Sequence, residues 1–204
     1  MWASIKETVK TVVYALLIAG VFRTFLFQPF WIPSGSMKET LLVGDFLFVN
    51  KMAYGYSYAS CPSIIIPRVG LDIDAEDFCG FFKGGNDRLF GSKPEAGDVV
   101  VFRHPVTGRD FIKRLIGTPG DTVQVRDGTL YINGDLVPQT DAGLFVEPFV
   151  QRGMPPAFPQ CSNRTVPIGE DCLKQRFTET LPNGAEYTVL NVGERAFDNT
   201  AVST

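Results

Sequence analysis

The sequence predicts a mostly β protein, in which an antiparallel β-sheet domain follows a single N-terminal transmembrane helix. The first observation is a hydrophobic segment at residues 8–27, and the second is a pair of hairpin signals, Asp127-Gly128 and Asn133-Gly134. The third is composition: of 204 residues, 17 are Phe, 20 are Gly and 14 are Pro. This mixture favours short strands joined by tight turns over a helical bundle.

The N-terminal segment has the length and flanks of a membrane anchor. Its core, residues 12–22, carries no charge, and about 20 helical residues cross the roughly 30 Å hydrocarbon layer. Lys6 and Lys10 precede the core and predict a cytoplasmic N-terminus, whereas Arg23 must extend its charge to the far interface. An aromatic belt is expected at the exit, formed by Phe25, Phe27, Phe30 and Trp31.

Residues 1–27 are therefore interpreted as an uncleaved anchor and residues 28–204 as an extracytoplasmic domain. A cleaved signal peptide is the main alternative, but Phe22, Arg23 and Phe25 occupy the positions where a small-x-small cleavage site would stand. A buried helix is the third interpretation. Either of the first two delivers the remaining chain outside the cytoplasmic membrane.

The four cysteines suit an oxidising compartment. None lies in a Cys-x-x-Cys pair and the chain has one histidine, which argues against zinc. Two local disulfides, Cys61–Cys79 and Cys161–Cys172, are the preferred pairing, although four cysteines allow three connectivities and free thiols remain open.

The expected elements follow in chain order. Residues 30–33 are extended because a residue before proline avoids the α region. Residues 41–49 predict a strand, a turn at Gly44-Asp45 and a second strand, and residues 56–97 an irregular surface insertion. The rest predicts strands at 98–102 and 111–116 around a turn at 105–110. It also predicts a meander of three strands, at 122–125, 129–132 and 136–137, joined by type I′ turns at 127–128 and 133–134, and a later hairpin near 183–184.

Charge and histidine content exclude several functions. A net charge of −3 argues against a nucleic-acid partner. His104 is the one histidine and stands beside Pro105 in an expected turn, so a Ser-His-Asp triad and a multi-histidine metal site are both disfavoured. We expect neither a metal nor another cofactor.

One segment has the pattern of a nucleophile turn. Ser34-Gly35-Ser36-Met37 follows Pro33, where the backbone must turn sharply. Such a turn can expose a hydroxyl and aim backbone N–H groups at a developing oxyanion, as acyl transfer requires. Taken alone, Ser-Gly-Ser is more often a plain turn.

The base for that hydroxyl is expected to be a lysine. Lys113 would share a strand face with Phe111 and Leu115, and Arg114 adds adjacent positive charge. Both effects lower a lysine pKa toward the range of a useful general base. An extended lysine at a strand edge is the ordinary alternative. Weaker candidates, in polar surroundings, are Lys38, Lys51 and Lys83.

Four ordered motifs resemble those of the type I signal peptidases, a Ser/Lys dyad family. They are Pro33-Ser34-Gly35-Ser36-Met37, Gly44-Asp45 with Asn50-Lys51, Gly97-Asp98 through Phe102, and Ile112-Lys113-Arg114 through Asp121. The resemblance implies that Ser36 attacks the peptide carbonyl and Lys113 takes its proton. It also implies that the Ser36 N–H and the Ser34 hydroxyl hold the oxyanion.

The same resemblance implies shallow apolar pockets that accept only small side chains at the first and third positions before the cut. Ordinary core packing is the alternative for each pocket residue, namely Phe30, Ile32, Pro33, Met37, Leu41, Leu47, Val100, Phe111 and Ile112. The implied activity is removal of signal peptides from exported preproteins at the outer face of the cytoplasmic (inner) membrane. Implied partners are signal peptides, the lipid bilayer and the secretion translocon.

Two departures from the family pattern bear on activity. Glu39 stands where the family usually has proline, three residues after the serine. The family's late Gly-Asp-Asn-Arg-Asp-Asn-Ser motif, which orients the lysine, is missing, so we expect a C-terminally truncated chain. The alternatives are therefore a non-catalytic, membrane-anchored protein that binds signal peptides, and a related Ser/Lys maturation peptidase.

Overall fold

A computed structural model of the chain divides into two compact units, which are described one at a time. The first comprises residues 1–30 and 47–93, and the second residues 31–46 and 94–204. The structure describes residues 2–57, 60–61, 64–66, 71–73, 77, 80, 88–153, 158–163, 165–193 and 200–203.

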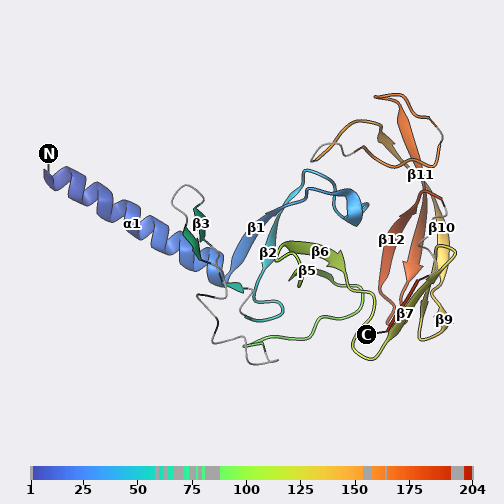
Figure 1. Ribbon diagram of the computed structural model, residues 1–204, viewed down its shortest axis with the longest axis horizontal. Helices are drawn as coiled ribbons and strands as arrows, with labels where there is room; N and C mark the ends of the chain where they lie inside the picture. The colour runs from blue at the N-terminus through green and yellow to red at the C-terminus, as the bar shows by residue number, and fades with distance from the viewer. Residues whose placement is uncertain are drawn as a thin grey trace. The chain divides into compact units, whose positions relative to one another are not determined.

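The first unit begins with a long helix, α1 (Trp2–Phe25), followed by strand β1 (Phe27–Trp31) (Figure 1). Within α1, Ile5–Phe25 is long and apolar enough to cross a membrane. Its large apolar side chains, such as Leu16 and Ile18, are exposed rather than packed against the protein. The predicted N-terminal apolar helix is thereby confirmed.

The remainder of this unit is built from short strand pairs. Strand β1 pairs with β2 (Phe46–Asn50), and β3 (Ile64–Ile66) pairs with β4 (Leu71–Ile73). The β3–β4 hairpin lies inside the predicted irregular insertion, so the insertion is not wholly irregular. Cys61 is disulfide-bonded. The predicted Cys61–Cys79 pairing lies outside the described residues, because Cys79 is not among them.

The prediction of two strands within residues 41–49 was half wrong. Only the second half, β2, is a strand, and residues 41–45 form a turn. The Leu42 N–H donates to Asp45 Oδ2 at 2.8 Å, and the Asp45 N–H donates to the Leu42 carbonyl at 3.2 Å. The aspartate side chain thus offers the backbone a local partner in place of a ladder.

The second unit contains the predicted hairpins. Strand β5 (Val99–Arg103) pairs with β6 (Asp110–Arg114), and a four-stranded sheet has the order β13-β7-β8-β9. The turn residues Asp127, Gly128, Asn133 and Gly134 all have positive φ, between 48° and 88°. Both turns are therefore of the predicted type I′. The strands of this sheet are β7 (Thr122–Arg126), β8 (Thr129–Ile132), β9 (Asp135–Leu136) and β13 (Thr200–Ser203).

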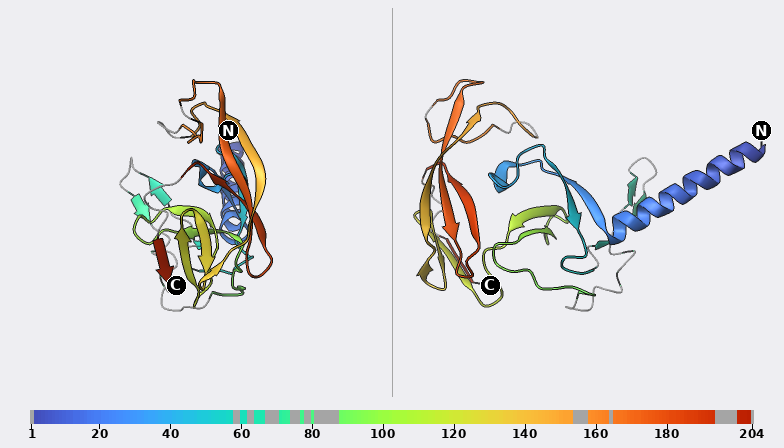
Figure 2. Two further views of the ribbon diagram at one scale, coloured as in Figure 1. Left: turned by 90° about the vertical axis from the view of Figure 1, so that its right-hand side faces the viewer. Right: turned by 180° about the vertical axis from the view of Figure 1, so that it is seen from behind.

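A three-stranded antiparallel sheet completes this unit, with β11 at its centre (Figure 2). Its strands are β10 (Gln139–Pro148), β11 (Asp171–Thr180) and β12 (Glu186–Asn191). The hairpin predicted near Asn183-Gly184 joins β11 to β12. The two long strands β10 and β11 were not predicted, because their polar residues hide the alternating apolar pattern.

The core of the second unit is small and lies between elements of these two sheets. It comprises Leu130, Ile132, Val137, Leu181 and Tyr187. The predicted Cys161–Cys172 disulfide is present, and it ties the start of β11 to the preceding loop. Closing a loop in this way limits the freedom of the unfolded chain.

Candidate active site

Ser36 lies on a short turn that is anchored on both sides. We call residues 33–40 the serine turn; its centre is a 3-10 helix, Gly35–Met37. Before it, Ile32 is 1% exposed, and its N–H donates to the Asp45 carbonyl at 3.0 Å. Within it, Met37 is 7% exposed. Ser36, which precedes Met37, is itself exposed, so the buried neighbours hold an outward-facing hydroxyl.

Strand β6 carries Lys113 to this hydroxyl. Lys113 pairs with Val100 across the β5–β6 ladder, and Val100 and Phe111 share its face of the sheet. Burial lowers the pKa of the Lys113 ammonium from its ordinary value. Lys113 Nζ donates a hydrogen bond to Ser36 Oγ. A lysine of reduced basicity thus lies in direct contact with the hydroxyl.

The sequence predicted that the positive charge of Arg114 would lower the pKa of Lys113, and the structure contradicts this. Successive side chains on a strand point to opposite faces, so Arg114 lies on the other side of β6 from Lys113. Its guanidinium donates to the Gly97 carbonyl at 2.6 Å and to Thr40 Oγ1 at 2.8 Å. It also lies 4.9 Å from the ring centroid of Tyr187. Burial, not a neighbouring charge, is the cause of the lowered Lys113 pKa.

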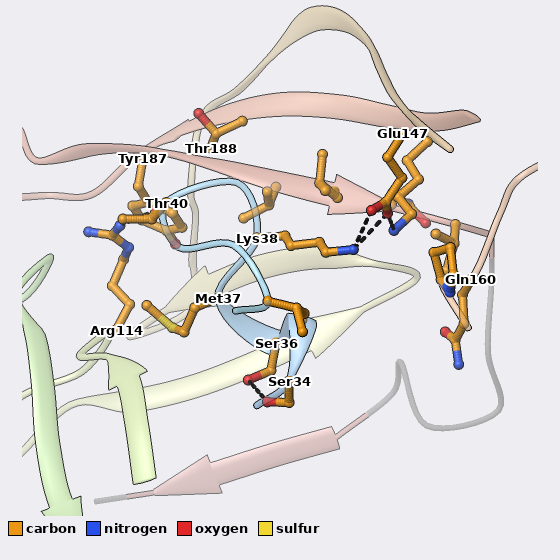
Figure 3. A pocket seen from close by; sticks show the side chains of 18 of the residues that line it. Ser34, Ser36, Met37, Lys38, Thr40, Arg114, Glu147, Gln160, Tyr187 and Thr188 are labelled. Atoms are coloured by element: carbon orange, nitrogen blue, oxygen red, sulfur yellow. Dashed lines mark hydrogen bonds and ion pairs between the residues drawn. The ribbon is translucent and has the colours of Figure 1, made fainter. Parts of the chain in front are cut away.

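Ser34 lies beside the candidate nucleophile. Its Oγ is 3.5 Å from Ser36 Oγ, and both side chains are exposed (Figure 3). A hydroxyl at this place can donate to an oxygen that forms next to Ser36. The pair therefore has the composition of an oxyanion site made of one side-chain hydroxyl and one backbone N–H.

A cavity of about 1010 Å³ opens next to the serine turn. Four of the predicted site residues line it: Pro33, Ser34, Ser36 and Met37. Strands β10, β11 and β12 also line it, with residues that include Lys174. Figure 3 shows Glu147, Tyr187 and Thr188 among them. The cavity is large enough for an extended peptide segment.

The other predicted pocket residues are distributed over several elements. Val100 and Phe111 lie on the Lys113 face of the β5–β6 hairpin, whereas Ile112 lies on the opposite face. Ile32 is buried and Leu41 is half-buried. Phe30 and Leu47 belong to the first unit, on β1 and β2.

His104 has a structural role in a turn. Its Nδ1 accepts hydrogen bonds from the backbone N–H groups of Val106 and Thr107, each at 3.2 Å. Its ring centroid lies 5.0 Å from that of Phe111. Within the described ranges, no group of three or more His, Cys, Asp or Glu residues could hold a metal ion.

The sequence analysis missed a cluster of charged residues behind the serine turn. The side chain of Lys38, judged a weak candidate in polar surroundings, is 9% exposed and contacts Glu147 of β10, which also contacts Lys174 of β11. Glu39, which stands where the family usually has proline, is paired with Arg176 Nη1 at 3.1 Å. Only sequence-distant pairing creates these contacts, so no local signal could have found them.

Comparison with known proteins places the chain in a family. The family model described as signal peptidase, peptidase S26, matches residues 5–182. The chain belongs to this peptidase S26 family. Similar proteins include Signal peptidase I of Rickettsia typhi and of Rickettsia prowazekii, each 36% identical over 187 residues, which is 90% of this chain and 56% of the relative. Signal peptidase I of Rickettsia massiliae is 36% identical over 185 residues, 89% of this chain and 55% of the relative.

This S26 chain therefore spans about half the length of the curated relatives that it matches. The family match covers the anchor candidate, the serine turn and β6, and it continues through β11. Family membership thus agrees with the resemblance found in the sequence motifs.

Proposed function

We propose that this chain is a membrane-anchored serine endopeptidase that removes signal peptides from preproteins. Ser36 is the nucleophile and Lys113 is the general base. The contact of Lys113 Nζ with Ser36 Oγ is the single observation that carries the proposal. The relatives named Signal peptidase I support the substrate class.

The reaction needs Lys113 in its neutral form. The contact then runs the other way, and the Ser36 hydroxyl donates to the Nζ lone pair. As Ser36 Oγ bonds to the scissile carbonyl carbon, its proton passes to Lys113 Nζ. The lowered pKa supports this role, because a lysine of ordinary pKa near 10.4 is almost wholly protonated at neutral pH.

The negative charge that forms on the carbonyl oxygen needs donors. The Ser36 N–H and the Ser34 hydroxyl supply them in this proposal, and the 3.5 Å between the two hydroxyl oxygens supports it. When the intermediate collapses, the C–N bond breaks and the proton on Lys113 passes to the leaving amine. A water then gives a proton to Lys113 and attacks the acyl carbon. The bond from that carbon to Ser36 Oγ breaks, and the proton passes from Lys113 to Ser36 Oγ, which restores the hydroxyl.

Specificity for small-x-small sites is proposed to arise by exclusion. Shallow apolar pockets admit small side chains and reject large ones, which requires no polar recognition. In this proposal, some of the predicted pocket residues form the pocket walls. Pro33 and Met37 line the cavity, and Val100 and Phe111 lie on the same face of the β5–β6 hairpin as Lys113.

The anchor completes the proposal. Residues 1–27 form a single-pass anchor with the N-terminus in the cytoplasm, and the peptidase domain faces the extracytoplasmic side of the inner membrane. An N-terminal helix that exposes its apolar side chains supports the anchor. Lys6 and Lys10, which precede its apolar core, support a cytoplasmic N-terminus. Signal peptides, the bilayer and the secretion translocon are the proposed partners.

The test uses the full chain in detergent micelles with a preprotein that carries an Ala-x-Ala site. We expect cleavage directly after that site, identified by the mass of the product, and no cleavage by Ser36→Ala. A preprotein with Leu in place of the last Ala is expected to stay intact. Binding without cutting would favour a non-catalytic signal-peptide-binding protein. Cutting at other sites alone would favour a maturation peptidase.

A further inference from the structure

A carboxylate lies between two lysines behind the serine turn. Lys38 Nζ donates to both oxygens of Glu147, at 2.7 and 2.5 Å, and Lys174 Nζ donates to Glu147 Oε1 at 2.5 Å. The three side chains are between 7% and 9% exposed. No step of the proposed reaction uses them, and charges this well buried are rare unless they are paired.

Two members of this cluster belong to one sheet, and the third comes from the serine turn. In the β10–β11 ladder, Glu147 pairs with Cys172 and Phe145 pairs with Lys174, so Glu147 and Lys174 lie on the same face as diagonal neighbours. Their ion pair is therefore internal to the sheet. Lys38 lies 109 residues from Glu147 in the chain and attaches the serine turn to that sheet.

Lys38 is fixed to the serine turn as well as to Glu147. Its N–H donates to the Gly35 carbonyl at 3.2 Å. Its stem lies over Gly35, because a Cβ added to Gly35 would come within 3.0 Å of Lys38 Cε and 3.4 Å of Cδ. Figure 3 shows Lys38 extending from the turn to Glu147, away from the hydroxyls of Ser34 and Ser36. The segment that carries Ser36 is thus tied to β10.

We propose that Glu147 is a positioning residue, which holds Lys38 and so keeps the serine turn in the place where Ser36 Oγ meets Lys113. This inference rests on the proposed function, because it assigns Glu147 a part in the same reaction. A displacement of about 1 Å between reacting groups can lower a rate by about a hundredfold. A short turn with no strand ladder of its own needs such an attachment.

The charges of the cluster favour this arrangement. Burial alone raises the pKa of Glu147, but the hydrogen bonds and charges of Lys174 and Lys38 outweigh it, and the pKa of Glu147 lies below its ordinary value. The carboxylate is therefore ionised at neutral pH. Removing its charge would leave two buried lysine side chains without their carboxylate partner, which favours a displaced turn in which Lys38 reaches solvent.

The first variant is Lys38→Met, which keeps an unbranched stem over Gly35 and leaves the Glu147–Lys174 pair intact. We expect kcat for the Ala-x-Ala preprotein to fall at least about tenfold with KM within about twofold, and the midpoint of the pH profile to stay unchanged. Glu147→Gln should lower kcat at least as far. The double variant should be no slower than Glu147→Gln alone, because both changes remove the same attachment.

The matched control is Arg103→Gln. It removes the Arg103–Asp110 ion pair, an interaction at 3.3 Å on the β5–β6 hairpin, without touching the serine turn. Its kcat should equal that of the unchanged chain. A shifted pH midpoint with an unchanged plateau in Lys38→Met would overturn the proposal, because the lysine would then act through its charge and not through position.

A second measurement does not depend on cleavage. Amide hydrogen exchange of the full chain in micelles should become at least about tenfold faster in Lys38→Met at position 38 and at Leu41, whose N–H groups donate to the Gly35 and Met37 carbonyls of the serine turn. Exchange at Leu130 and Ile132 in the core should stay unchanged. If the unchanged chain does not cleave the Ala-x-Ala preprotein, the proposed function fails. Amide hydrogen exchange then decides by itself whether Lys38 and Glu147 hold the serine turn in place.

The two measurements must agree for the inference to stand. Slower turnover without faster exchange in the turn would overturn it, since position would not be the cause. Faster exchange throughout the domain would also overturn it, since the cluster would then stabilise the fold as a whole. Faster exchange confined to the turn, with lower kcat where the chain cleaves, supports it.

Discussion

The two partners of the Ser36–Lys113 contact are held by different kinds of structure. Lys113 lies on β6, where five consecutive residues pair with β5 in an unbroken antiparallel register. Ser36 lies on a turn whose only regular element is three residues long. The turn relies instead on side-chain contacts from distant parts of the chain, through Lys38 to Glu147, Glu39 to Arg176 and Thr40 to Arg114.

This difference teaches that the proposed base and the proposed nucleophile are vulnerable in different ways. A strand ladder fixes the direction of each side chain by alternation, so the place of Lys113 follows from its register. The place of Ser36 depends on several separate contacts, and each can be removed alone. Changes at Lys113 should therefore act through chemistry, and changes in the serine turn through geometry and stability.

The largest effect is expected from Lys113→Met. The variant keeps the length of the side chain but has no group that accepts a proton, so kcat for preprotein cleavage should fall by about a thousandfold or more. The fold should persist, because an apolar side chain suits the half-buried site. Kinetics with purified chain would measure this, with Lys93→Met at an exposed position as the control. Retained activity would show that another group is the base.

Activity should depend steeply on pH. Because the proposed reaction needs a neutral Lys113, kcat should rise about tenfold per pH unit and level off at the lowered pKa, below the ordinary value near 10.4. The stability of the fold should change with pH in the same direction. Lys113 in the unfolded chain keeps its proton to higher pH than in the folded chain, so its contribution to the free energy of unfolding increases as the pH rises from the lowered pKa to about 10.4. A profile that levels off only above pH 10.4 would contradict a role for burial.

A smaller effect is expected where the serine turn is packed. Met37→Ala removes a buried side chain beside Ser36 and should lower the free energy of unfolding by about 2–4 kcal/mol. Chemical denaturation of the chain in micelles measures this value. Val106→Ala is the control: that side chain is 86% exposed, and its loss should change stability by less than about 0.5 kcal/mol. Equal losses in both variants would show that Met37 does not anchor the turn.

The smallest effect is expected at the single histidine. His104→Ala removes the acceptor of two backbone N–H groups in the β5–β6 turn and should cost about 0.5–1.5 kcal/mol of stability. Cleavage should stay within about twofold, because Lys113 and not His104 contacts Ser36. A loss of activity comparable with that of Lys113→Met would reverse the assignment of the base.

Local patterns in the sequence predicted the parts of the fold that local chemistry determines. Asp127-Gly128 and Asn133-Gly134 identified type I′ turns, because few other residues adopt two successive positive φ angles. The apolar run within α1 identified a helix long enough to cross a membrane. The alternation around Lys113 placed it correctly on a strand face with Phe111.

Long-range contacts account for what the sequence did not predict. Strands β10 and β11 carry polar residues, such as Glu147 and Lys174, that turn inward only because they meet each other and Lys38. Residues 41–45 form a turn and not the predicted strand, because the Asp45 side chain accepts a hydrogen bond from the Leu42 N–H. The charge of Arg114 was expected to act on Lys113, but strand alternation directs it to Thr40 and Tyr187.

Because Lys113 and Arg114 point to opposite faces of β6, the function of each depends on the register of the strand. Loss of one residue before Lys113 within the strand would move Arg114 into the register position of Lys113, next to Ser36, and turn Lys113 to the opposite face of the sheet. A guanidinium keeps its proton at any physiological pH, so the shifted chain could fold and yet be silent. Neighbouring positions of like charge on this strand are thus not interchangeable, because only one of the two faces Ser36.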